Sequence, residues 1–163
     1  MKILRLVVLV IVAAPALVVV AGQLGAFRGT RPGGLGVHGG QLLPPSDTPN
    51  SVSSQASPDA SRVLGYDPRI APLRYTGDPA AAMKKLAALL EATPGVVVVT
   101  KLPGYIYAQA TTRLLKFTDD VEFYLDAPAG VIQVRSASRL GKSDLGTNRA
   151  RIESLRARFE ASP

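Results

Sequence analysis

A strict apolar–polar alternation from Val121 to Asp126, followed by a short loop and a second run, constrains the fold of this chain most. In the first stretch, Val121, Phe123 and Leu125 share one face and polar residues share the other. The loop 127–130 contains Pro and Gly, and a second run begins at Val131. A loop of this length and composition is typical of an antiparallel hairpin. The sequence therefore predicts two paired strands here.

The alternation also predicts the register of this hairpin. Placing the two ends of the loop opposite each other, Asp126 with Val131, aligns Leu125 with Ile132, Phe123 with Val134, and Glu122 with Arg135. Apolar residues then meet on one face and opposite charges on the other, and a cross-strand pair of this kind contributes about 0.2–1 kcal/mol. The simplest interpretation of Glu122 and Arg135 is a surface ion pair. A role in binding a ligand or partner is the alternative, and catalysis is a third.

Two helices flank the predicted strands. Asp78 and Pro79 open the first helix, as an N-cap acceptor followed by proline at the first helical position, and residues 93–95 end it. The second helix runs from about Leu145 to Phe159, with Asp144 or Asn148 as its cap. Their apolar stripes consist of Met83, Leu86 and Leu90 in the first helix and Ile152, Leu155 and Phe159 in the second.

Strands are also predicted over 96–99 and 105–112, with a bulge or twist before Asp119 and Asp120. Short connections make neighbouring strands antiparallel. The predicted fold is therefore α+β: an antiparallel sheet of about four strands in meander order, with two helices packed on one face.

The sheet face away from these helices is the main candidate for binding. Tyrosine offers a broad amphipathic contact at low entropic cost and is enriched in interfaces. The alternative is that the segment 43–75 covers this face. The face is predicted to carry Tyr105, Tyr107, Gln109, Glu122, Tyr124, Gln133 and Arg135.

Arginines near the end of the last strand suggest that the ligand of this candidate site is an anion. Arg135 and Arg139 share a strand face if the strand persists, and Arg149 begins the second helix. Arginine presents a planar fork that matches a phosphate or a carboxylate. The predicted ligand-binding residues are Tyr105, Tyr107, Glu122, Tyr124, Arg135, Arg139, Asp144 and Arg149.

A hydrolase-like enzyme built around Asp119, Ser136 and Asp144 is the alternative function. Serine hydrolysis needs a base, and the one histidine of the chain, His38, is remote in sequence. Asp119 and Asp120 point to opposite sides of an extended backbone, so they do not form a carboxylate pair. No catalytic residue, metal ligand or cofactor is therefore assigned.

Long stretches of the chain resemble the domain of unknown function 1499 family, which occurs in bacteria and in chloroplast-containing eukaryotes. The motifs are FTDDVEFYLD, VIQVRSASR and SDLGTNRARIE, with TPNSVSSQA upstream, and the resemblance covers roughly Leu43 to Phe159. The upstream motif usually carries Cys where this chain has Ser51. The resemblance implies no assigned activity, and Ser51 removes any thiol chemistry.

The N-terminus predicts export. Lys2 and Arg5 precede an uncharged apolar run from Leu6 to Ala21, and Gly22 follows small residues. This pattern fits a signal peptide cleaved after Ala21, or a retained membrane anchor if the following apolar residues extend it. We expect an extracytoplasmic domain, periplasmic or membrane-anchored, whose N-terminal segment contacts the membrane if it is not cleaved.

Composition completes the predicted organisation. Residues 1–24 form the signal or anchor, residues 25–60 a Gly/Pro/Ser-rich linker with the TPNSVSSQA motif, and residues 61–163 the α+β domain. The absence of Cys excludes disulfides and thiolate catalysis. The net charge of +7 is scattered, which favours general attraction to anionic surfaces over nucleic-acid binding. An anionic ligand, a lipid or an envelope protein is the expected partner.

Overall fold

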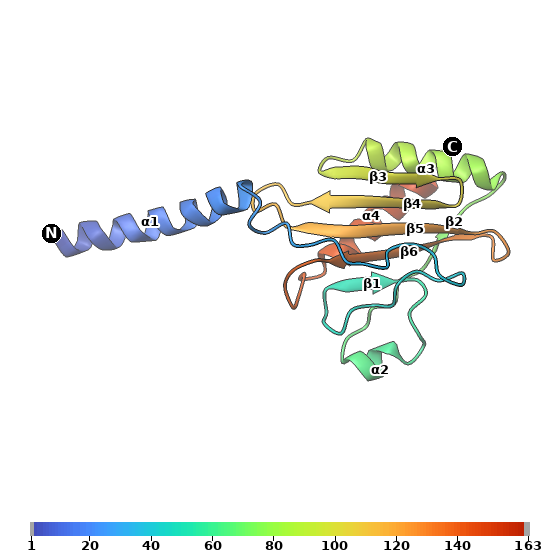
Figure 1. Cartoon of the computed structure of the whole chain (residues 1–163), viewed down its shortest axis with the longest axis horizontal. Coiled ribbons are helices and arrows are strands. Elements are labelled where there is room, and N and C mark those ends of the chain that lie inside the picture. The colour runs from blue at the N-terminus through green and yellow to red at the C-terminus, as the bar shows by residue number, and fades with distance from the viewer. Residues whose placement is uncertain (1, 162–163) are drawn as a thin grey trace.

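The computed structural model describes the backbone of residues 2–161 and the side chains of residue 11 and residues 13–161. Its centre is an antiparallel meander, with β3 (Val96–Leu102), β4 (Tyr105–Thr111), β5 (Thr118–Asp126) and β6 (Val131–Ser138) paired in that order (Figure 1). The predicted α+β class and the consecutive order of these strands are confirmed.

Two short strands bring the sheet to six. β1 (Ser51–Ser53) and β2 (Leu73–Arg74) both pair antiparallel with β6, beyond the four predicted strands. Segments of two or three residues are too short to show a period-two pattern, so the sequence gives no signal for them. Val52 and Leu73, one from each strand, belong to the hydrophobic core.

The predicted hairpin register is confirmed at each position. Asp126 pairs with Val131, Phe123 with Val134, and Glu122 with Arg135. The irregularities lie elsewhere than expected. β4 and β5 are separated by a loop over residues 112–117, and the bulge lies in β3 between Val98 and Thr100.

The helices α3 (Pro79–Glu91) and α4 (Thr147–Ala161) supply the apolar residues that cover one face of the sheet. Asp78 caps α3, since its carboxylate accepts a hydrogen bond of 2.8 Å from the backbone N–H of Ala81. The carboxylate of Asp144 accepts one of 2.7 Å from the backbone N–H of Asn148 at the start of α4. The core between helices and sheet contains Met83, Leu86, Leu90, Ile106, Phe123, Ile132, Val134, Ile152, Leu155 and Phe159.

Two further helices lie outside this core. α2 (Ala60–Leu64) is a single short turn, and α1 (Lys2–Gln23) extends away from one end of the sheet (Figure 1). Over the residues that the structure describes, no helix combines the length and apolarity needed to cross a membrane. The end of α1 contacts the 112–117 loop, because the Gln23 amide donates to the carbonyl oxygens of Arg113 and Leu114 at 3.2 and 2.7 Å.

Residues 28–44, which we call the cover segment, cross the sheet face opposite α4 (Figure 1). The cover segment contains no helix or strand apart from an isolated bridge between His38 and Gln41. It nevertheless contacts the sheet, and Arg31, Gly36 and Pro44 are among the residues that do so. The Gly-rich region expected as a linker therefore forms the third layer of the molecule.

Candidate functional site

The strand register gathers the polar face that the alternation predicts. Tyr107 of β4, Glu122 of β5 and Arg135 of β6 are paired in one row across three strands. Asp120 lies two residues along β5 on the same face, and Arg139 follows the end of β6. The predicted assembly of Tyr105, Tyr107, Glu122, Arg135 and Arg139 is thus present.

Glu122 and Arg135 form a buried ion pair, and the surface interpretation is wrong. The side chain of Glu122 is 0% exposed and that of Arg135 is 7% exposed, with 3.5 Å between Glu122 Oε2 and Arg135 Nη1. Glu122 Oε1 also accepts hydrogen bonds of 2.8 Å from the Tyr105 hydroxyl and from the backbone N–H of Gly36. The cover segment buries the pair, and its composition carries no sign of this.

A second buried ion pair lies beside the first. Arg139 donates to both carboxylate oxygens of Asp120, at 2.7 and 3.0 Å. Tyr107 is 0% exposed, and its hydroxyl donates to Asp120 at 2.6 Å and accepts from Arg139 at 3.1 Å. The bonds to Asp120 raise the pKa of Arg139. This pair is therefore compact and fully engaged.

The two arginines differ in how well they are bonded. Arg135 makes hydrogen bonds of 3.3 Å to the carbonyl oxygen of Pro44 and 3.5 Å to Glu122, both at the long end of the usual range. Burial lowers the pKa of Arg135, and the neighbouring Glu122 only partly opposes this effect. Arg135 is thus a largely buried cation whose two hydrogen bonds within the protein are long.

The tyrosines respond to the same environment. Burial, followed by the hydrogen bond to Glu122, raises the pKa of Tyr105. Burial, followed by the hydrogen bond to Asp120, raises the pKa of Tyr107. Arg31 of the cover segment lies over the Tyr107 ring, with its guanidinium carbon 4.3 Å from the ring centroid. Tyr124 is partly exposed and lies near Gly40.

The cover differs in position from the alternative that the sequence suggested. Residues 28–44 lie over the sheet face that carries Tyr105, Tyr107 and Tyr124, which we call the tyrosine face, whereas the expected cover was the segment 43–75. Most of that expected segment lies beyond β6, where β1 and β2 extend the sheet. Apolar residues such as Val52 and Leu73 direct it to the core instead.

Two predicted binding residues lie apart from this face. Asp144 caps α4, accepting hydrogen bonds from the backbone N–H groups of Gly146 and Asn148. Arg149 donates to the carbonyl oxygen of Asp67 at 2.8 Å. The structure therefore does not bring Asp144 or Arg149 together with Arg135.

Two of the three residues of the alternative enzyme, Asp119 and Ser136, lie in a different cluster on the helix side of the sheet, whereas the third, Asp144, caps α4. Asp119 accepts a hydrogen bond of 2.5 Å from Arg151 of α4, and Ser136 donates one of 2.5 Å to Asn148. Arg151 also donates to Ser136 and Asn148, at 3.1 and 2.7 Å. Ser136 and Asn148 are both 0% exposed. Asp119 and Asp120 point to opposite layers, as their adjacency predicted.

Sequence reasoning missed several residues that organise these clusters. Asn148 reaches the TPNSVSSQA motif by donating to the carbonyl oxygen of Asn50 at 2.9 Å, and Asn50 donates to the carbonyl oxygen of Gly141 at 2.6 Å. Strand parity with Glu122 was the signal that could have placed Asp120 on the tyrosine face. Arg31 carried no signal, because it lies in a segment without periodicity.

Ser51 of the TPNSVSSQA motif lies in a hydroxyl cluster. Its Oγ accepts from the backbone N–H and the Oγ of Ser46, both at 2.9 Å, and lies 3.0 Å from the Tyr66 hydroxyl. Ser51 is 3% exposed. This environment satisfies the hydroxyl and gives it a structural role in joining β1 to the preceding loop.

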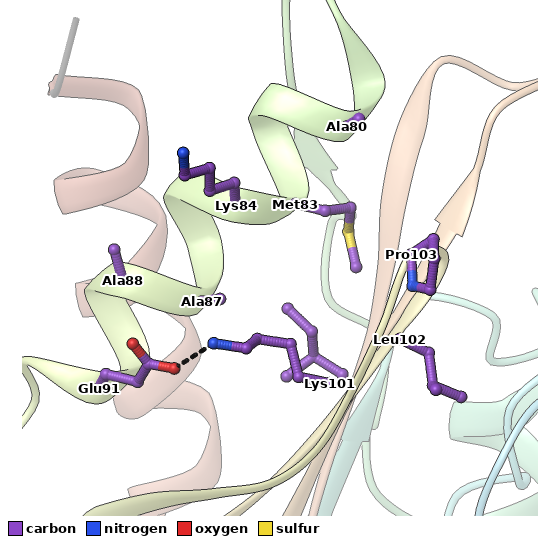
Figure 2. Close-up of a pocket in the computed structure, with 10 residues that line it drawn as sticks. Ala80, Met83, Lys84, Ala87, Ala88, Glu91, Lys101, Leu102 and Pro103 are labelled. Carbon is purple, nitrogen blue, oxygen red and sulfur yellow. Dashed lines mark hydrogen bonds and ion pairs between the residues drawn. The ribbon is translucent and has the colours of Figure 1, made fainter.

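The molecule also has open hollows that the sequence did not indicate. A groove of about 400 Å³ lies between α3 and the β3–β4 hairpin, with Met83 and Ile106 in its lining (Figure 2). The Lys101 ammonium binds Glu91 at 2.7 Å across one end of it. A smaller hollow of about 270 Å³ lies beside the 112–117 loop and the start of α4. Among the described side chains, no group of three His, Asp or Glu could hold a metal ion.

Neither a curated protein nor a solved structure matches this chain. A family model does match, that of a protein of unknown function (DUF1499), over residues 41–159. The match spans the six-stranded sheet, the helices α2 and α3, and α4 up to Phe159. It includes Tyr107, Glu122 and Arg135 of the tyrosine face and Asp119, Ser136 and Asn148 of the opposite cluster. The chain belongs to the DUF1499 family.

Proposed function

We propose that this protein is a non-enzymatic domain of the cell envelope that binds an anionic group at Arg135. The ligand is a small molecule or a lipid headgroup that presents a carboxylate or a phosphate. The N-terminal segment carries the domain out of the cytoplasm, either as a cleaved signal or as a retained membrane anchor. The site consists of Arg135, Glu122 and Tyr105, beneath the cover segment.

The weak bonding of Arg135 carries this proposal. A buried guanidinium is costly unless its donors are well used, and its two hydrogen bonds measure 3.3 and 3.5 Å. A carboxylate or phosphate would offer charge-assisted bonds of about 2.7–2.9 Å in a forked geometry. Binding an anion would therefore relieve a desolvated cation that Glu122 only partly compensates.

The cover segment is suited to give way to such a ligand. Two of its contacts with the site use backbone atoms, the N–H of Gly36 and the carbonyl oxygen of Pro44, and do not depend on packed side chains. A ligand oxygen would take the place of the Pro44 oxygen at Arg135. The glycines of the segment allow this rearrangement, because glycine adopts backbone conformations closed to other residues.

Nuclear magnetic resonance of arginine side chains tests this proposal without altering the fold. The full chain, labelled with nitrogen-15, is titrated with inorganic phosphate and with citrate, and the Nε–H signal of Arg135 is identified from the Arg135→Lys variant. We expect this signal to shift saturably. The Arg149 signal is the matched control, because Arg149 binds a carbonyl oxygen and lies outside the site.

An Arg135 signal that stays in place, or that moves only as the Arg149 signal does, would refute the proposal. The hydrolase alternative gains no support from the geometry. Ser136 is fully buried, and its hydroxyl is held by Asn148 and Arg151.

A further inference from the structure

The end of the domain from which α1 leaves is formed by two neighbouring loops, residues 112–117 and residues 139–146. Thr118 at the end of the first loop accepts a hydrogen bond from the backbone N–H of Arg139 at the start of the second. The chain just after α1 touches both sides of this end. Phe27 stacks on Phe117 at 5.1 Å between ring centroids, and Gly29 approaches Arg139 so closely that a Cβ would lie 2.7 Å from the Arg139 Cβ.

Leucines project from this end into solvent. Leu145 is 95% exposed, Leu114 60% and Leu140 40%, and Leu24, just beyond α1, is 83% exposed. Leu145 also has a φ of 52°, a conformation that costs a residue with a side chain about 1–2 kcal/mol. Strained backbone conformations cluster at functional sites, so the conformation of Leu145 is an indication of function at this end.

The same loops are basic. Arg113 and Lys142 are exposed, Lys116 is partly exposed, and Asp144 is the one acidic residue in either loop. The carboxylate of Asp144 is already engaged by the N–H groups at the start of α4. Exposed leucines interspersed with cations are the pattern of a surface that inserts into the headgroup region of an anionic bilayer.

The position of α1 points to the same partner. Ile11, Leu17 and Val20 on α1 are exposed, so its apolar surface continues toward the loop leucines. A membrane that contacted α1 near its C-terminal end would also meet Leu114 and Leu145. The β3–β4 turn, with the exposed Leu102, lies at the opposite end of the sheet (Figure 1).

We propose that this end of the domain, with Leu114, Leu140 and Leu145 and the cations Arg113 and Lys142, docks onto the surface of an anionic bilayer. This inference rests on the membrane association in the proposed function and goes beyond it, because it assigns the docking residues and orients the domain. The strands then stand with the 112–117 and 139–146 loops toward the lipid and the β3–β4 turn away from it.

The absence of tryptophan from the chain makes this orientation measurable. Single-tryptophan variants of the full chain, Leu145→Trp, Leu114→Trp and Leu102→Trp, are reconstituted with vesicles of phosphatidylcholine and phosphatidylglycerol. Lipids brominated on their acyl chains quench an indole that reaches the hydrocarbon boundary. We expect a blue shift and strong quenching for L145W and L114W. L102W is the matched control and should keep the emission of an indole in water.

A variant without two of the cations tests independently whether charge contributes to the docking. Replacing Arg113 and Lys142 together by Gln in the L145W background should reduce quenching on vesicles with phosphatidylglycerol toward the level seen on phosphatidylcholine alone. Replacing Lys84, which is exposed on α3, by Gln should leave the quenching unchanged. Circular dichroism of each variant verifies that the fold is kept.

Flotation separates this inference from the proposed function. If the protein floats with the vesicles but L145W and L114W are quenched no more than L102W, the docking inference is wrong and membrane attachment stands. If the protein does not float, the docking inference and the retained membrane anchor are both wrong, whereas export with a cleaved signal is not affected. Binding of phosphate at Arg135 is measured separately and does not depend on either result.

Discussion

The buried pair of Glu122 and Arg135 has a measurable consequence for stability. Replacing Arg135 by Met leaves the Glu122 carboxylate without its cation in a fully buried position. We expect the free energy of unfolding to fall by about 3–5 kcal/mol, the usual cost of breaking a buried ion pair on one side. Urea denaturation monitored by circular dichroism measures this change.

The matched comparisons for Arg135→Met are a double variant and an exposed pair. Adding Glu122→Gln should recover most of the loss, since no uncompensated charge remains. Lys101→Met, which breaks a pair whose side chains are 57% and 49% exposed, should cost only about 0–1 kcal/mol. Equal losses for Arg135→Met and Lys101→Met would show that the Glu122 pair is solvated in solution.

Tyr105 makes the stability of the folded protein depend on pH in the alkaline range. Its pKa is raised in the folded protein, so the folded state holds the phenol proton at pH values where the unfolded state, with a pKa near 10, has lost it. The stabilising contribution is thus complete below about pH 10 and is lost as pH rises further. Tyr105→Phe should flatten the decline of unfolding free energy above about pH 10. Tyr75→Phe, which removes a phenol packed against the hydrophobic core, serves as the control. An unchanged slope in Tyr105→Phe would contradict the assignment.

At the scale of residues, the sequence predicted which side chains lie opposite each other better than it predicted whether they are buried. Strand alternation placed Glu122 opposite Arg135 correctly, because side-chain direction has a strict period of two. It could not predict that the pair is buried, since the covering residues have no periodicity. The engagement of Asp120 with Arg139 was missed for a related reason, because Arg139 lies just beyond the end of β6.

At the scale of elements, the junction between α3 and β3 depends on a single glycine. Gly95 has a φ of 79°, and a Cβ there would lie 2.8 Å from the Thr111 carbonyl oxygen. We expect Gly95→Ala to lower the free energy of unfolding by about 1–3 kcal/mol, from left-handed strain and this contact together. Gly104→Ala, in the β3–β4 turn, should be nearly neutral, because nothing lies within 4 Å of its added Cβ. Thermal denaturation measures the stability loss of both variants. Equal losses would argue against this close approach of Gly95 to Thr111.

The cover segment offers a similar comparison. Gly36 has a φ of 126° and donates its N–H to Glu122 at 2.8 Å. Gly33 has no positive φ, and nothing lies within 4 Å of a Cβ added there. Gly36→Ala should therefore loosen the segment and Gly33→Ala should not. Hydrogen–deuterium exchange over residues 28–44 is the measurement. Faster exchange in Gly36→Ala alone supports the contact, and identical exchange in both variants contradicts it.

The elements that could be predicted are those with a strong apolar periodicity and with residues that mark where the element begins or ends. The four long strands and the helices α3 and α4 all carry an apolar pattern and clear end signals such as Asp78 and Pro79. β1, β2 and the cover segment acquire their conformation from contacts with segments distant in sequence, such as β5 and β6. Local sequence carries little information about contacts of that kind.

The location of the whole molecule remains a prediction, and it depends on the first residues of the chain. We expect the domain to be found outside the cytoplasm, with a mature N-terminus at either Gly22 or Met1. Protease protection in spheroplasts, combined with N-terminal sequencing, distinguishes these forms. Recovery of the intact chain from the cytosol would contradict the proposed export.

The neighbouring residues Asp119 and Asp120 tie the sheet to both of its outer layers from one dipeptide. Asp119 binds Arg151 of the helix layer, and Asp120 binds Arg139 on the covered face. A one-residue slip of β5 would turn the two carboxylates to the opposite layers and break both of these arginine contacts as they stand. The helix layer and the covered face therefore both depend on the same alignment of this strand, so a change in that alignment would be felt on the two sides of the sheet at once.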